Sequence, residues 1–93
     1  MNSEDAQILA LQVLTFLVED GARIEGFLRM TGTDPSDLRA LATSPDGLAA
    51  ILDYLLGNEA LLLAFTGEAQ CPDDAPARAH RTLAGSRPTP DWT

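Results

Sequence analysis

Leucine and alanine dominate this chain, and their surplus over β-branched residues is what most constrains the fold. The 93 residues include 15 Leu and 14 Ala but only five Val and Ile together. Leu and Ala favour helices, whereas Val and Ile are the residues that favour strands. A chain of this length forms one domain around one core. We therefore predict an all-α fold: a compact orthogonal bundle of five or six short helices over residues 1–85, followed by an extended, proline-containing C-terminal tail at 86–93.

Capping residues divide the chain into these helices. Two pairs, Asp34-Pro35 and Ser44-Pro45, each place a capping side chain before a proline at the first helical position. Asn58 can begin another helix after Gly57, although one continuous helix over 45–70 is the alternative. The expected helices span about 4–20, with Ser3 as N-cap and Gly21 as stop, then 22–31, 35–43, 45–56, 59–70 and 74–84.

The first expected helix has an unusually narrow polar side. Apolar residues fill most of its circumference, and Phe16 is expected to share one core with Phe27 and Phe65. Such a helix needs cover on more than one side, so we expect it at the centre of the bundle or shared with a second copy in a homodimer. The last helix offers only three apolar residues for burial, which predicts that it is weakly docked: Ala75, Ala79 and Leu83.

Two residues are candidates for an interaction surface. Leu63 falls beside Thr66 and two other polar residues on the side of its helix that should face water. Trp92 is the only Trp, and it lies on the proline-containing tail. Each has an ordinary alternative, because single exposed leucines are common and a tail Trp can fold back onto its own bundle. Leu63 and Trp92 are therefore predicted to mark an apolar contact surface.

The sequence offers no arrangement typical of catalysis or metal binding. One Cys and one His cannot supply the usual four-ligand zinc site within a chain. The acids that follow Cys71 raise rather than lower the pKa of a thiol, and His80 lies between two arginines on the surface of the last helix. We expect no catalytic residue, no metal ligand and no cofactor, so the protein is not predicted to be an enzyme.

The charge is strongly acidic and unevenly distributed. The chain carries 14 acidic side chains against six arginines, a net charge of −8. Residues 1–75 carry −10 and residues 76–93 carry +2. An acidic body repels phosphates, which argues against nucleic acid as a partner. The alternative is a regulatory protein that contacts nucleic acid through its C-terminal arginines, Arg78, Arg81 and Arg87.

Nothing in the sequence predicts export or membrane insertion. The first residues include Glu4 and Asp5 instead of the basic start of a secretory signal. The longest apolar stretch, 48–65, contains Asp53 and Glu59, which a bilayer would penalise. We expect a cytoplasmic protein with no membrane contact.

The order of three segments is similar to a known family. The segments "LALQVLTFLVED", "FLRMTGTDPSDLR" and "LAAILDYLLGNEALLLAF" resemble domain of unknown function 3572, a family of short alphaproteobacterial proteins. The likeness covers about residues 4–70. It implies a compact helical fold in a bacterial cytoplasm, and it carries over no catalytic residue. The expected function is therefore that of a small acidic protein-interaction module or accessory subunit, with a protein partner or a second copy.

Overall fold

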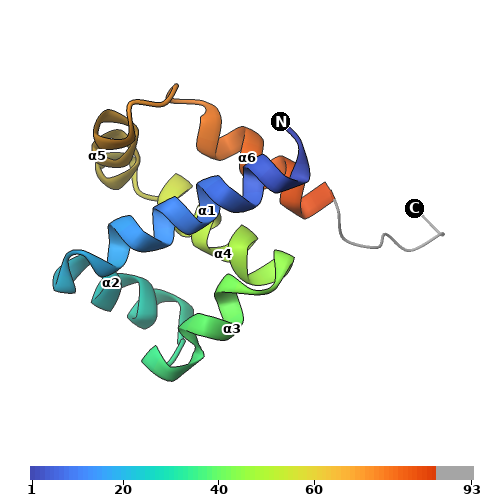
Figure 1. Cartoon of the computed structure of the whole chain (residues 1–93). Helices are drawn as coiled ribbons and strands as arrows, with labels where there is room; N and C mark the ends of the chain where they lie inside the picture. The colour runs from blue at the N-terminus through green and yellow to red at the C-terminus, as the bar shows by residue number, and fades with distance from the viewer. Residues whose placement is uncertain (86–93) are drawn as a thin grey trace.

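The computed structural model describes residues 1–85, which form a compact bundle of six α-helices and one short 3-10 helix with no strand (Figure 1). The predicted all-α class and helix number are confirmed. The expected tail at 86–93, which includes Trp92, lies outside the described residues. The elements are α1 (Ser3–Val18), α2 (Gly21–Thr31), η1 (Pro35–Asp37), α3 (Leu38–Ala42), α4 (Pro45–Leu56), α5 (Glu59–Ala69) and α6 (Ala75–Gly85).

The predicted break after α4 is confirmed. The Asn58 side chain accepts a hydrogen bond from the Leu61 amide at 3.2 Å and starts α5. The chain turns at Gly57, so the single continuous helix is excluded. No individual helix within residues 1–85 has the length and hydropathy to cross a membrane; α4 and α5 meet that test only as a pair bent by 107°.

Three helix assignments differ from the prediction. Asn2, and not Ser3, is the N-cap of α1, because its side chain accepts a hydrogen bond from the Asp5 amide at 2.7 Å. Gly21 begins α2 and does not end α1, since the Asp20 side chain accepts from the Ala22 amide and caps α2. The expected helix over 35–43 is divided into η1 and α3.

The core lies between α1, α4 and α6, and α1 runs across α4 (Figure 1). All three phenylalanines are buried in one cluster, as predicted. The rings of Phe16 and Phe65 meet edge to face with centroids 5.5 Å apart, which joins α1 to α5. Phe27 makes the same kind of contact with Tyr54 at 5.3 Å and joins α2 to α4.

The prediction that the last helix is weakly docked is wrong. Its three expected core residues, Ala75, Ala79 and Leu83, are all buried, and α6 packs along both α1 and α4. Alanine side chains are short, so they allow helix backbones to approach closely. The Thr82 hydroxyl lies 2.9 Å from the Arg78 carbonyl within α6 and 3.2 Å from the Met1 carbonyl, which places α6 beside the start of the chain.

The expected cover of α1 is present on only one side. Its buried residues form one continuous face that packs on α4 and α6: Ala6, Leu9, Ala10, Val13, Phe16 and Leu17. The opposite face is open within residues 1–85, although it carries large apolar side chains. The fold thus leaves an apolar surface on its first helix.

Candidate functional site

The open face of α1 carries a regular apolar stripe. Ile8, Leu11 and Val18 are 49, 41 and 49 % exposed, and Thr15 lies between the last two. Spacings of three, four and three residues are those by which a helix presents one seam to a partner helix. The Thr15 hydroxyl donates to the Leu11 carbonyl at 3.0 Å, so this polar group is satisfied within the helix. We call these four residues the α1 stripe.

Acidic side chains border the α1 stripe. Glu4 and Glu19 are exposed near its two ends, and α1 contains no Lys or Arg. Asp5 lies in the first turn of the same helix, where its charge favours the helix N-terminus. A partner of the α1 stripe therefore meets an apolar centre and a negative border.

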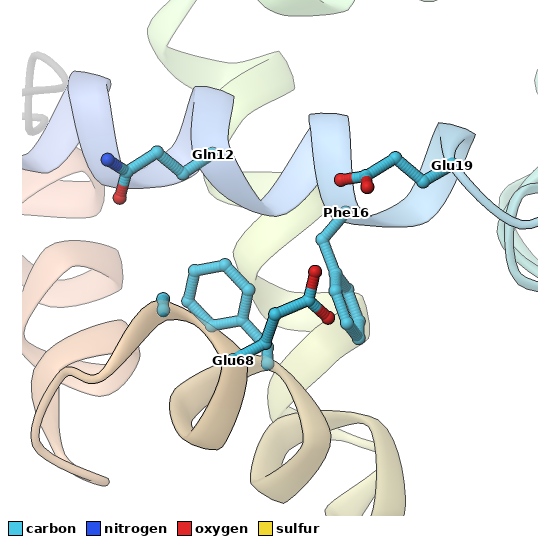
Figure 2. Close-up of a pocket in the computed structure, with 6 residues that line it drawn as sticks. Gln12, Phe16, Glu19 and Glu68 are labelled. Carbon is cyan, nitrogen blue, oxygen red and sulfur yellow. The ribbon is translucent and has the colours of Figure 1, made fainter.

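A hollow of about 190 Å³ opens between α1 and α5 beside the α1 stripe. In Figure 2, Phe16 points from α1 toward α5, and the Glu68 carboxylate rises from α5 toward α1. Glu19 extends along α1 toward the same space, and Gln12 lies further toward the N-terminal end of the helix. We call this the α1–α5 hollow; it is lined by Gln12, Phe16, Glu19, Phe65, Glu68 and Ala69.

One arginine already contacts an aromatic ring of the α1–α5 hollow. The Arg23 guanidinium carbon lies 3.9 Å from the centroid of the Phe16 ring, and Arg23 Nη1 donates to the Phe16 carbonyl at 3.3 Å. A cation over an aromatic ring is attracted by the partially negative face of the neutral ring. Neither Glu19 nor Glu68 forms an ion pair with any residue of the described chain. Their carboxylates are therefore available to a ligand.

The structure describes one of the two candidate residues from the sequence. Leu63 is 51 % exposed, as expected, but it lies about 140° around α5 from Glu68 at 100° per residue. Leu63 is therefore on a different side of α5 from the α1–α5 hollow. Trp92 lies outside the described residues. Sequence reasoning expected excess apolar surface on this helix, covered by the bundle or by a second copy, but it did not single out the residues of the α1 stripe, whose spacing is visible in the sequence.

Thr66 corrects the predicted orientation of α5. It was expected on the wet side with Leu63, but it is only 4 % exposed. Its hydroxyl donates to Asp73 Oδ1 at 3.1 Å and thereby ties the connection to α6 against α5. The sequence offers one signal for this burial. Asp73 follows Thr66 by seven residues and can accept a hydrogen bond from a buried hydroxyl.

Cys71 and His80 are the residues that were considered for catalysis from the sequence. Burial raises the pKa of the Cys71 thiol, and the nearby Asp73 charge raises it further, while a backbone hydrogen bond acts in the opposite direction. The direction agrees with the sequence expectation, but burial is the larger cause. His80 Nε2 lies 3.9 Å from Oδ1 of the exposed Asp53. Within residues 1–85, no group of three or more His, Cys, Asp or Glu side chains is placed to hold a metal ion.

Comparisons with known proteins locate the chain in a family. No curated protein and no solved structure matches it. One family model does match, over residues 3–86, and its description is "Protein of unknown function (DUF3572)". The match spans nearly all of the helical bundle and agrees with the resemblance seen in the sequence. The chain therefore belongs to the DUF3572 family.

Proposed function

We propose that this protein is a non-catalytic interaction module or accessory subunit that binds an amphipathic helix of a protein partner along the α1 stripe. The observation that carries the proposal is the exposed seam of Ile8, Leu11 and Val18 on a helix whose other face forms the core. An apolar helical seam is a common docking surface for a second helix. The second helix packs on it through apolar residues at the same spacing.

The size of the seam indicates how tightly it can bind. Burying a whole aliphatic side chain contributes about 1.5–3 kcal/mol, so a half-exposed one contributes about 1 kcal/mol. Three such residues give about 3 kcal/mol, less than the roughly 4 kcal/mol of a millimolar complex. The α1 stripe therefore positions a partner, and neighbouring contacts must supply further affinity.

A homodimer through α1 is the alternative that the same surface suggests. Two copies packed along the α1 stripe would bury the same side chains twice, and sedimentation would detect the pair. The nucleic-acid alternative has less support. Arg78 is 3.5 Å from Asp74 in an ion pair, and Arg87 lies outside the described residues, which leaves Arg81 as an exposed arginine of this segment.

The experiment replaces the α1 stripe without changing the charge. Ile8→Gln/Leu11→Gln should leave the helical circular dichroism and melting temperature nearly unchanged, because both residues are already half in water. The wild-type protein is used to capture its partner from a native extract, and mass spectrometry identifies the partner. The double variant should capture less of it. Met30→Gln is the matched control, since Met30 is an exposed apolar residue on α2.

Three outcomes separate the candidates. Loss of a captured protein only in the Ile8→Gln/Leu11→Gln variant supports a protein partner on α1. A dimer in sedimentation that this variant dissociates supports the homodimer. A monomer that captures the same proteins with and without the two substitutions contradicts a role for the α1 stripe. Leu63→Gln, measured in parallel, tests whether Leu63 belongs to a second contact surface.

A further inference from the structure

We propose that the α1–α5 hollow binds an arginine or lysine side chain of the partner, so that the partner is a basic amphipathic helix. This inference rests on the proposed function and specifies the chemistry of the partner. The hollow adjoins the α1 stripe on the same helix: Gln12 and Glu19 follow Leu11 and Val18 by one residue each. One helix can therefore place apolar residues on the α1 stripe and a flanking residue in the hollow.

Charge complementarity selects a cation. Glu19 and Glu68 approach the hollow from different helices, and neither is paired within the described chain. Arg23, which contacts Phe16, offsets one negative charge, and the two glutamates leave the site with a net negative charge. None of the residues that line the hollow is basic. An acidic side chain would repel these carboxylates, and a neutral donor could bond to them but would leave their charge uncompensated as the interface excludes water.

The apolar lining of the hollow suits the rest of such a side chain. Phe16 and Phe65 are part of the lining, and lysine and arginine bury their methylene stems on apolar surface while the charged group stays near polar groups. The guanidinium of Arg23 already lies over the Phe16 ring, so the partner's charged group is expected to meet the two glutamates instead of this ring. The volume of about 190 Å³ admits one long side chain.

A second copy of α1 cannot supply this group. Because α1 contains no Lys or Arg, two copies packed along the α1 stripe would face each other with glutamates and glutamines at the borders. Each partner in a stable complex buries roughly 800 Å², far more than three half-exposed aliphatic side chains provide, so contacts beyond the stripe are needed. A heterologous basic helix supplies the missing charge, and its contacts in the hollow add to the apolar contacts on the stripe.

The test uses two synthetic helical peptides that differ only in charge. Both carry leucines at the two seam positions of each heptad; one carries arginine at the flanking positions, and the other carries citrulline, which has nearly the same shape without the charge. Dissociation constants come from ¹⁵N chemical shifts of the whole protein. We expect the arginine peptide to bind about tenfold more tightly and to shift the amides of Gln12, Glu19 and Glu68.

Matched protein variants localise the effect. Glu19→Gln/Glu68→Gln should reduce the preference for arginine to about twofold or less. Glu25→Gln/Asp37→Asn removes the same number of charges from exposed positions elsewhere and should keep the preference. Raising the NaCl concentration should weaken binding of the arginine peptide and leave the citrulline peptide nearly unaffected.

The result that overturns the inference is distinct from failure of the proposed function. Equal affinity for the two peptides, or an equal loss of preference in both double variants, overturns the inference. If both peptides then bind the Ile8→Gln/Leu11→Gln variant more weakly than the wild-type protein, the proposed function stands without this inference. If neither peptide shifts an amide of α1, the inference is also overturned, and the proposed function is judged on the capture experiment.

Discussion

At the scale of the residue, Gly47 shows how closely two helices meet. A Cβ atom built on Gly47 would overlap the carbonyl oxygen of Leu41 and lie 2.5 Å from its Cα. Both of these are backbone atoms, so the contact cannot be relieved by turning a side chain. Glycine is needed here for close approach, and its φ angle plays no part in the requirement.

We therefore expect Gly47→Ala to lower the free energy of unfolding by about 1–3 kcal/mol or more, as overpacking does elsewhere. Gly67→Ala is the matched control, because nothing lies within 4 Å of its Cβ position in α5. There alanine should be neutral or should stabilise the helix by up to about 1 kcal/mol. Urea unfolding followed by circular dichroism measures both. Equal stability of the two variants would contradict the tight contact between α3 and α4.

At the scale of the element, the sequence predicted the helices better than their packing. Caps such as Asn58 and Ser44 act locally, so their side-chain chemistry is visible in the sequence and the structure confirms it. Packing depends on which helices meet, which no local pattern records. This is why α6 was judged weakly docked from its few apolar residues, and why the open face of α1 was expected to be covered.

The close packing of α6 makes a specific prediction. Ala79 is fully buried where α6 lies against α1 and α4, so Ala79→Leu adds volume to a filled core. We expect a loss of about 1–3 kcal/mol in the free energy of unfolding. Ala60→Leu, at an exposed position of α5, should change stability by less than about 0.5 kcal/mol. If Ala79→Leu were tolerated as well as Ala60→Leu, α6 would be the loosely held helix that its composition suggested.

At the scale of the whole molecule, the dominant electrostatic feature is repulsion between like charges. The net charge of −8 belongs to a small bundle, and the described residues contain few ion pairs to offset it, among them Arg78 with Asp74. The same charge that we propose attracts a basic helix therefore opposes the compact state of the free protein. Salt screens exposed charges over roughly 8–10 Å at physiological ionic strength, so it should relieve this repulsion.

We expect the melting temperature to rise by about 2–4 °C between 20 and 200 mM NaCl, a change that corresponds to roughly 0.5 kcal/mol for a domain of this size. The measurement is thermal unfolding by circular dichroism at pH 7. Glu25→Lys removes two units of net negative charge at an exposed site on α2 and should both raise the melting temperature at low salt and reduce its salt dependence. A melting temperature that falls as salt is added would mean that attractive pairs outweigh the repulsion. In that case the acidic surface would not destabilise the free protein. A basic partner would then have no such repulsion to relieve on binding.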